Sequence, residues 1–224
     1  MTSSALDRAS RPLIAVSAII GTVNSPQATE TRRRRGRPAA GDPERVALLA
    51  LRRFASHGYE ATTMEAIADL AGIGRRTLFR YFPSKPDLVW GGMEPVVERM
   101  HRVLDSPGAG ESTRDVIARA MTESLDLDPD TLEATRLRLR LMASDPALIA
   151  FGVLRLTASR DLIAGFLGRR LGAEASELRV RVLADAISSA NFSALLWWAT
   201  NRDDDDPARA SVEALDALLD LHLP

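Results

Sequence analysis

The sequence predicts an all-α fold, with a small N-terminal three-helix domain followed by a larger C-terminal helical domain. Four Asp-Pro pairs, at Asp42, Asp128, Asp145 and Asp206, each place an N-cap carboxylate before a proline suited to the first helical position. Apolar residues recur at the spacing of one helix face, and no segment alternates in the manner of a strand. The 224 residues are enough for one large or two modest domains.

The N-terminal domain is expected over residues 31–90, and its first two helices follow from local signals. The first helix runs from about Pro43 to Ser56 and buries an apolar stripe. The second begins near residue 62 or 63, because Thr62 and Glu65 have capping-box spacing.

A short turn joins the second helix to a third, expected from Gly74 to Phe82. Gly72 can adopt the positive φ that such a turn needs, and Ala68 is small enough for the two helices to cross closely. This arrangement is typical of a helix-turn-helix. Pro83 then ends the third helix.

The C-terminal domain is expected over residues 91–224. Further helices are expected at about 86–104, 112–126, 129–143, 146–171, 174–200 and 207–222. The last two are rich in apolar and small residues, which suits a helical partner. Residues 1–30 are expected to be an unstructured extension or the product of a misassigned start codon; their apolar run, Pro12 to Ile20, lacks the small-residue cleavage site of a signal peptide.

Composition and charge narrow the function. The absence of cysteine excludes disulfides and thiolate chemistry and fits a cytoplasmic protein, and no apolar run approaches the roughly 20 residues of a membrane span. Residues 31–90 carry 12 basic and 6 acidic side chains, a net charge of +6, whereas residues 91–224 carry 15 basic and 22 acidic ones, a net charge of −7. The N-terminal domain is therefore the candidate for binding a polyanion.

The third helix has one apolar and one charged face. At about 100° per residue, Leu78, Phe79 and Phe82 share one arc and the charged residues fill the opposite one. A helix of this kind fits the major groove of DNA, where arginine pairs with guanine and threonine contacts the thymine methyl. We expect base reading by Arg75, Arg76, Thr77 and Arg80, with Gly74 at the helix start, and phosphate contacts by Thr63, Tyr81 and Lys85. The alternative is a solvated helix face.

A basic arm precedes the first helix. Its five arginines are Arg32, Arg33, Arg34, Arg35 and Arg37, in a segment too polar to fold. Such an arm can enter the minor groove beside the recognition helix. It can also act as a nonspecific electrostatic tether.

The segment GYEATTMEAIADLAGIGRRTLFRYFPSKPDL, Gly58 to Leu88, resembles the DNA-binding domain of the TetR family of bacterial transcriptional regulators. Within that family, GIGRRTLFRYFPSKPDLVWG and residues 136–172 resemble regulators associated with mycofactocin gene clusters. The sequence departs from the family at Phe79, where many members have a tyrosine whose hydroxyl reaches phosphate. Anchoring would then fall to Tyr81 and Lys85.

The resemblance implies a C-terminal domain that binds a small molecule, and a homodimer in which the last two helices form a four-helix bundle. Two recognition helices in a dimer, about 34 Å apart, require a nearly palindromic operator. A ligand that prefers another spacing would shift the population towards release of DNA. Repressor action is expected.

The ligand is expected to be an amphipathic anion such as a long-chain acyl-CoA, because residues 112–171 combine apolar side chains with arginines. The candidate pocket residues are Arg136, Leu137, Arg140, Leu141, Phe151, Leu154, Arg155 and Phe166. An ordinary helix-bundle core with solvated arginines explains the same residues. Trp197 and Trp198 are expected to pack rather than to line the pocket.

Enzymatic activity is not expected. The three histidines lie far apart in sequence, and there is no glycine-rich phosphate loop or serine elbow. Asp203 to Asp206 are contiguous, as in a solvated turn, so we expect no metal site and no cofactor. A ligand-independent architectural DNA-binding protein remains the second alternative, and its indifference to operator sequence would distinguish it.

Overall fold

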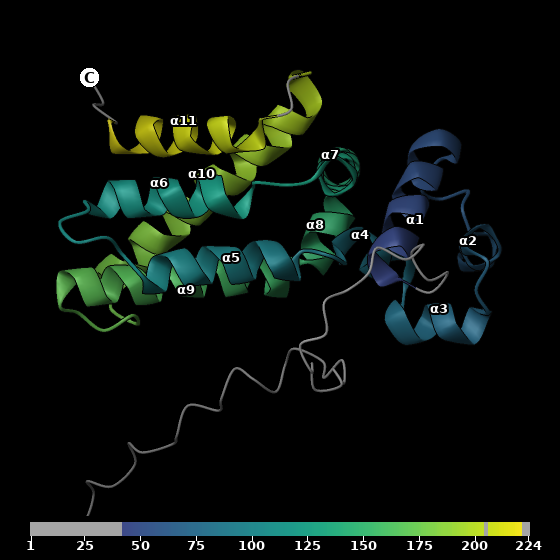
Figure 1. Ribbon diagram of the computed structural model, residues 1–224, viewed down its shortest axis with the longest axis horizontal. Coiled ribbons are helices and arrows are strands. Elements are labelled where there is room, and N and C mark those ends of the chain that lie inside the picture. The colour runs from purple at the N-terminus through teal and green to yellow at the C-terminus, as the bar shows by residue number, and fades with distance from the viewer. Residues whose placement is uncertain (1–41, 204–205, 221–224) are drawn as a thin grey trace, which may run out of the picture. The chain divides into compact units, whose positions relative to one another are not determined.

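The described part of the chain is built from helices and turns, without a strand. The computed structural model describes residues 42–203 and 206–220, all within a unit that starts at Pro38. The first four helices are α1 (Pro43–His57), α2 (Met64–Ala71), α3 (Arg75–Tyr81) and α4 (Lys85–Trp90). They are followed by α5 (Glu94–Asp105), α6 (Thr113–Ser124), α7 (Pro129–Ser144), α8 (Pro146–Phe151), α9 (Val153–Leu171), α10 (Leu178–Asn201) and α11 (Pro207–Leu219). The predicted all-α class is confirmed (Figure 1).

All four Asp-Pro pairs begin helices, as predicted. Asp42 accepts a hydrogen bond from the amide of Glu44 at the start of α1, and Asp128 accepts two amide hydrogen bonds at the start of α7. Asp145 and Asp206 accept amide hydrogen bonds in the first turns of α8 and α11. These carboxylates satisfy backbone donors that a helix start otherwise leaves without a partner.

The prediction of one helix over residues 86–104 was wrong. The structure has two helices, α4 and α5, separated by Gly91, Gly92 and Met93. Gly92 has φ of +79°, a left-handed conformation that ends the regular hydrogen bonding and that glycine adopts without a steric penalty. The break places α4 as an independent short segment between α3 and α5.

The prediction of one helix over residues 146–171 was also wrong, because Gly152 separates α8 from α9. A Cβ atom built on Gly152 would lie 1.9 Å from the ring of Trp90, so only glycine lets α4 approach this closely. A smaller correction concerns α2, whose N-cap is Thr63; the Thr62 hydroxyl instead donates a hydrogen bond to the carbonyl of Gly58.

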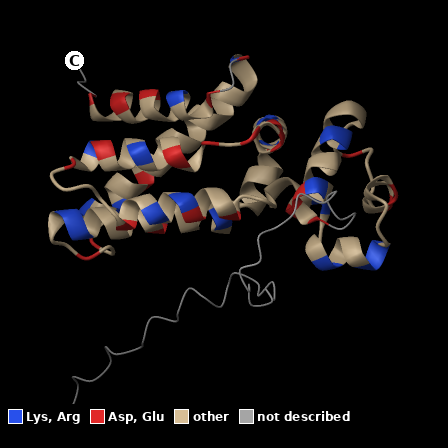
Figure 2. Cartoon of the chain, in the orientation of Figure 1, with Lys and Arg blue, Asp and Glu red and all other residues tan. Residues whose placement is uncertain are grey.

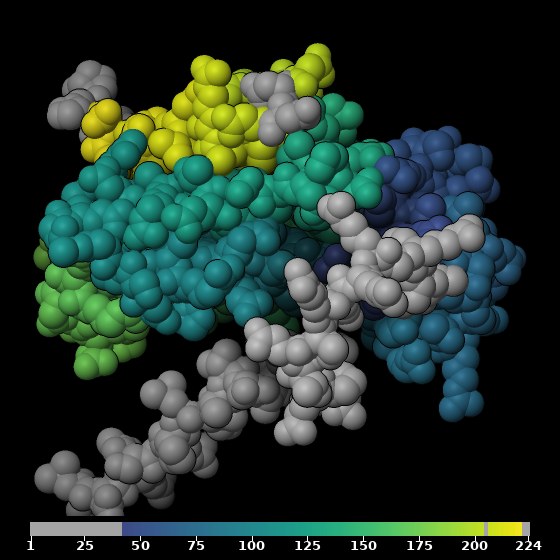
Figure 3. Space-filling model, viewed as in Figure 1, coloured from purple at the N-terminus to yellow at the C-terminus, as the bar shows by residue number. Residues whose placement is uncertain are grey.

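The helices enclose two apolar cores. In Figure 1, α5, α6 and α11 lie one beside the next, and Figure 3 shows α11 as a ridge over α6. The second core contains residues of α5, α6, α9, α10 and α11, including Phe166 and Leu215. The first core joins α1 to α4 with α7, α8 and the end of α10, including Leu78 and Trp198. The helix-turn-helix thus shares its core with helices of the C-terminal half.

Two predictions about organisation stay predictions. The division into domains 31–90 and 91–224 is one of them. The other is the extension at residues 1–30, which lies outside the described residues, as do residues 221 and 222 of the predicted final helix.

Candidate nucleic-acid interface and effector cavity

The α2–α3 turn has the geometry that its glycines predict. Gly72 has φ of +66°, and its amide donates to the carbonyls of Ala68 and Asp69 at the end of α2. Gly74 is the N-cap of α3, with extended backbone and no side-chain cap. Two residues after the left-handed glycine, the chain therefore enters a new helix in a different direction, as a helix-turn-helix requires.

The buried and exposed faces of α3 match the predicted arcs except at Tyr81, which was expected on the charged side but is half-buried and packs against the first core, as Phe79 does. Leu78 is fully buried, and Phe82, the C-cap residue of α3, is 5% exposed. Both belong to the core shared with α7 and α8. The three arginines of α3 are exposed, whereas Thr77 and Tyr81 are half-buried. α3 carries no acidic side chain, so its arginines form a basic surface (Figure 2).

Only weak or exposed contacts hold the arginines of α3. Arg75 forms an exposed ion pair with Glu65 of α2 at 3.0 Å, and its guanidinium lies over the Phe79 ring. Arg80 donates to the Tyr81 hydroxyl at 3.2 Å. Arg76 has neither an ion pair nor a hydrogen bond to any other residue in the described ranges. Exposed pairs contribute little to stability, so these arginines can be redirected to a ligand at low cost.

The residues predicted to contact phosphate already have partners within the protein. The Lys85 ammonium donates to the carbonyl of Tyr59 at 2.9 Å and lies 4.3 Å from the centre of the Tyr59 ring. It also lies 3.5 Å from Glu60. The Thr63 hydroxyl caps α2, and the Tyr81 hydroxyl accepts from Arg80. Their role in DNA binding stays a prediction, and the five arginines of the basic arm lie outside the described residues.

Short contacts attach α4 to the C-terminal helices. The Trp90 indole N–H donates to the carbonyl of Leu148 at 2.7 Å, in α8. Asp87 accepts from Ser84 in a capping box, and through its other oxygen it pairs with Arg155 of α9 at 2.6 Å. Movement of α8 or α9 would therefore reach α4, and through α4 the helix-turn-helix.

Arg138 of α7 makes a further attachment, which the sequence did not reveal. Its guanidinium is buried, 5% exposed, and donates to the carbonyls of Val89 and Gly91 at the end of α4. Burial lowers the pKa of Arg138 to about 10, because the charged form is removed from water. Nothing in the sequence set it apart from the other arginines of residues 112–171.

The eight predicted pocket residues are distributed over several environments. Phe166 is fully buried in the second core, whereas Leu154 is 78% exposed. Arg136 lies over the Trp198 ring, and Arg140 donates to the carbonyl of Ala199. Arg155 pairs with Asp87 and lies over Phe151. Leu137 and Leu141 pack against the first core. None of the eight lines either of the two cavities described next.

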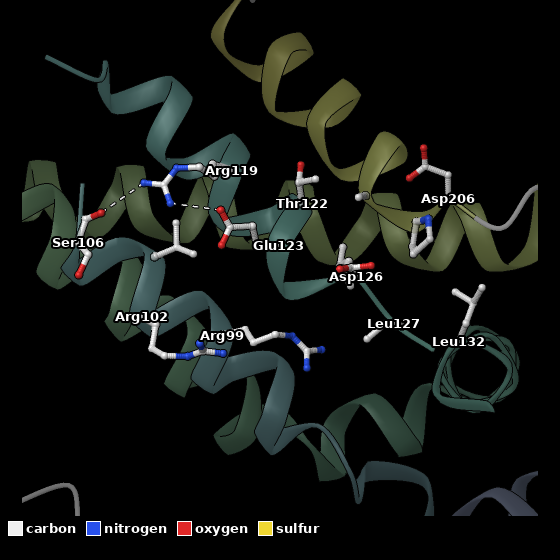
Figure 4. A pocket seen from close by; sticks show the side chains of 14 residues that line it. Arg99, Arg102, Ser106, Arg119, Thr122, Glu123, Asp126, Leu127, Leu132 and Asp206 are labelled. Carbon is white, nitrogen blue, oxygen red and sulfur yellow. Dashed lines mark hydrogen bonds and ion pairs between the residues drawn. The ribbon is translucent and has the colours of Figure 1, made fainter. Parts of the chain in front are cut away.

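A cavity of about 740 Å³ lies between α5, α6 and the starts of α7 and α11, and we name it the α5–α11 cavity (Figure 4). Arg99 and Arg102 extend from α5 on one side, and Asp126 and Leu127 lie on the segment between α6 and α7. Asp206 approaches from the start of α11. A second cavity, about 390 Å³, lies between α1, α5 and α7 and shares Arg99, Asp126 and Leu127 with the first.

Sequence reasoning did not single out Arg99 or Arg102. Their i, i+3 spacing puts them on one side of α5, but this pattern is equally typical of a solvated helix surface. None of the helices in the described ranges combines the length and apolarity that a membrane crossing demands. Within the same ranges, no three side chains gather as metal ligands would.

The chain matches two family models. Residues 49–89 match the model of the bacterial regulatory proteins of the tetR family, and residues 111–222 match the MftR C-terminal domain. The chain is 29% identical to a protein of Mycobacterium tuberculosis named as the mycofactocin biosynthesis transcriptional regulator MftR, over 83% of this chain and 91% of that protein. It is 37% identical to the transcriptional repressor KstR of Rhodococcus jostii, over 34% of this chain and 37% of KstR.

Solved structures share the fold. FadR of Bacillus subtilis, in complex with stearoyl-CoA, has a TM-score of 0.57 at 22% identity and covers 79% of this chain and 98% of its own. FadR of Thermus thermophilus, in complex with lauroyl-CoA, has a TM-score of 0.53 at 23% identity and covers 82% and 96%. With the helix-turn-helix and the two family matches, the conclusion is that the chain belongs to the TetR family, with an MftR-type C-terminal domain, and is a transcriptional regulator rather than an enzyme.

Proposed function

We propose that this TetR-family regulator binds a nearly palindromic operator as a homodimer, through α3, and that a small amphipathic effector releases it. It would act in the cytoplasm as a repressor. The observation that carries the proposal is the surface of α3, where exposed arginines stand opposite a buried apolar face.

The roles within the interface follow from chemistry. Arg75, Arg76 and Arg80 would donate to guanine acceptors in the major groove, and Thr77 would contact a thymine methyl. Thr63, Tyr81 and Lys85 would contact phosphates, and Gly74 would let the start of α3 approach the duplex. For Lys85, a phosphate contact would replace its hydrogen bond to Tyr59.

The basic arm would add affinity beside this interface. Its arginines are expected to neutralise phosphates and, where the minor groove is narrow, to enter it. A purely electrostatic tether remains the alternative, and it would add salt-dependent affinity without sequence preference.

Dimerisation is supported by the outer surface of α10. Val182, Ala186, Ser189, Ser193 and Trp197 lie at helical spacing, and Val182 and Trp197 are each more than half exposed. A stripe of small residues flanked by large apolar ones suits close packing of two symmetry-related helices. α11 packs beside α10 and would complete the four-helix bundle.

An amphipathic effector is supported by two observations. The C-terminal half combines apolar cavity walls with arginines. Two proteins of the same fold were solved with acyl-CoA molecules bound, which makes this ligand class a reasonable first choice for testing. The predicted pocket residues in α7, α8 and α9 stay part of the proposal.

The test of DNA binding compares matched pairs of arginines. A footprint on DNA flanking the gene identifies the operator, and fluorescence anisotropy measures affinity. Arg76→Ala with Arg80→Ala should lower operator affinity at least about 30-fold, since each base-reading arginine contributes roughly 1–3 kcal/mol. Arg170→Ala with Arg179→Ala removes the same charge from exposed positions on α9 and α10 and should leave affinity within about twofold.

The proposal fails if the α3 variant is folded and still prefers the operator over a scrambled duplex as strongly as the wild type. An architectural DNA-binding protein would show no such preference in either form, so the same competition experiment also decides that alternative.

A further inference from the structure

We infer that the α5–α11 cavity is the effector site, and that it takes a small amphipathic anion whose head group binds Arg99 and Arg102. This inference rests on the proposed effector response and assigns it a place that differs from the pocket predicted from sequence. The evidence is the size of the cavity, its distribution of unpaired charge and its apolar wall.

The size suits a ligand. At about 740 Å³ the cavity lies within the range of roughly 300–1,000 Å³ that small-molecule sites occupy. The neighbouring cavity is about half as large and is lined by five carboxylates against three arginines, whereas the α5–α11 cavity has three of each. The second cavity therefore favours an anion less, and the two cavities are not equivalent candidates.

Most of the charged side chains in the α5–α11 cavity that lack an oppositely charged partner are positive. Arg119 is neutralised by Glu111 at 2.9 Å and by Glu123 at 3.3 Å. Arg99 donates to the backbone carbonyl of Ser124 and forms no ion pair with a carboxylate of the described residues. Arg102 is exposed and has no hydrogen bond or ion pair to another residue in the described part of the chain.

The acidic side chains of the cavity are largely committed elsewhere. Glu123 pairs with Arg119, and Asp206 accepts the amide of Arg209 as the N-cap of α11. Asp126 is the exception, because no partner is found for it among the described residues. Two arginines against one aspartate favour a single anionic head, such as a carboxylate or a phosphate.

The apolar wall would hold the rest of the ligand. Val103 and Leu125 are buried, and Leu127 and Leu132 are half-buried on the side facing Arg99 (Figure 4). Removal of an apolar body from water against these side chains supplies affinity that the head group alone does not give. A neutral molecule of the same length should therefore bind more weakly than the anion.

The position also suggests how binding reaches the DNA-binding helix. Arg99 ties α5 to the end of α6 through Ser124, and a bound anion would compete for this guanidinium. α5 is separated from α4 only by residues 91–93, and α4 belongs to the core that contains Leu78 of α3. A shift of α5 would thus change the position of α3.

The experiment titrates the full-length protein, in isothermal calorimetry, with dodecanoate, dodecanoyl-CoA and dodecanol. We expect at least one of the two anions to bind and dodecanol to bind more weakly. Arg102→Ala should weaken binding of that anion about tenfold, as loss of a hydrogen bond to a charged group does, and Arg102→Lys should restore most of it. Arg99→Ala should act in the same direction, with circular dichroism confirming the fold. Which anion binds distinguishes a carboxylate from a phosphate head.

The control is the double variant Arg170→Ala with Arg179→Ala, which removes the same charge from exposed positions outside the cavity and should bind as the wild type does. The inference is overturned if both α5 variants bind the anion as tightly as the wild type, and loss of binding in Arg140→Ala with Arg155→Ala would then place the site in the pocket predicted from sequence. The inference is also overturned if neither anion binds the wild type. In that case the proposed DNA-binding function is judged separately, by measuring operator binding. If Arg102→Ala weakens binding of the anion but leaves operator affinity unchanged when no anion is present, the result supports the cavity as the effector site.

Discussion

At the scale of single residues, Gly152 shows how a missing side chain positions α4. Its Cα faces the ring of Trp90, and an added Cβ would lie 1.9 Å from it. Gly152→Ala should therefore displace the indole and weaken its hydrogen bond to Leu148, lowering the free energy of unfolding by about 1–3 kcal/mol in urea denaturation.

Gly165, in the middle of α9, is the matched control. A Cβ there would meet only the end of the Arg169 side chain at 3.7 Å. Gly165→Ala should stabilise the protein by roughly 0.5–1 kcal/mol, because alanine loses less backbone entropy in a helix. Equal effects of the two substitutions would contradict a steric role for Gly152.

The phenol of Tyr59 predicts how the stability of the fold depends on pH. Burial raises its pKa to about 12, and the carboxylates of Glu60, Asp145 and Asp87 add to the shift. In the unfolded chain the phenol ionises near pH 10, whereas the folded form keeps its proton, so stability falls as pH rises from about 10 to about 12. In a Tyr81→Phe variant, phenolate absorbance should rise with a midpoint near 12 when folded and near 10 in urea. A single midpoint near 10 in both states would show that Tyr59 is solvated.

Arg138 marks the limit of residue-level prediction. Arginine is usually exposed, and no local pattern in RLRLRL distinguishes Arg138 from Arg136 and Arg140. Its burial depends on the carbonyls of Val89 and Gly91, which come from α4 about fifty residues earlier in the chain. The sequence alone does not indicate that contact.

At the scale of helices, the Asp-Pro starts were predictable because capping is local. Asp128 accepts from the amides of Asp130 and Thr131 and from the Thr131 hydroxyl. Asp128→Ala should cost about 1 kcal/mol, measured by urea unfolding. Asp126→Ala, two residues earlier and outside the helix, should change stability by less than about 0.5 kcal/mol.

The effect of Asp128 should depend on pH. Its hydrogen bonds, first that of the Thr131 side chain, lower its pKa below the usual 3.8. A carboxylate with a depressed pKa contributes stability above its unfolded pKa and loses it as pH falls through the folded one. The difference between the wild type and Asp128→Ala should therefore begin to narrow as the pH falls below about 4 and close once the pH is below the depressed pKa of Asp128. A difference that stayed constant through this range would exclude capping by the ionised carboxylate as its cause.

The two incorrect helix predictions have the same cause. Gly91, Gly92 and Gly152 lie inside sequences that otherwise suit a helix, and a glycine in such a sequence is compatible with either outcome. Whether the helix breaks depends on what packs against the glycine, as Trp90 does at Gly152. The two faces of α3, in contrast, follow from periodicity alone.

At the scale of the molecule, the boundary in net charge along the chain does not coincide with the boundary between the two apolar cores. Net charge separates residues 31–90 from the rest, and this was visible in the sequence. The cores do not follow that division, since α1 to α4 share one with α7, α8 and the end of α10. The α5–α11 cavity was equally invisible, because segments from four helices and the loop before α7 meet only after folding.

The proposed dimer gives a prediction at this scale. Val182→Asp with Ser193→Asp would place four carboxylates across a two-fold axis on α10, and the protein should become a monomer by light scattering coupled to size exclusion. Leu154→Asp adds charge at a still more exposed apolar position on α9 and should leave the mass unchanged. A dimer that survives the α10 changes would place the interface elsewhere.

The shared first core has a consequence for engineering. Regulators of this kind invite the construction of chimaeras, in which the DNA-reading module of one protein is grafted onto the sensor of another at a convenient loop. A junction after Trp90 would separate Leu78 and Trp90 from Met142 and Leu148, so each fragment would meet a foreign apolar surface. A successful graft would have to carry the matching side chains of α7 and α8 along with the module.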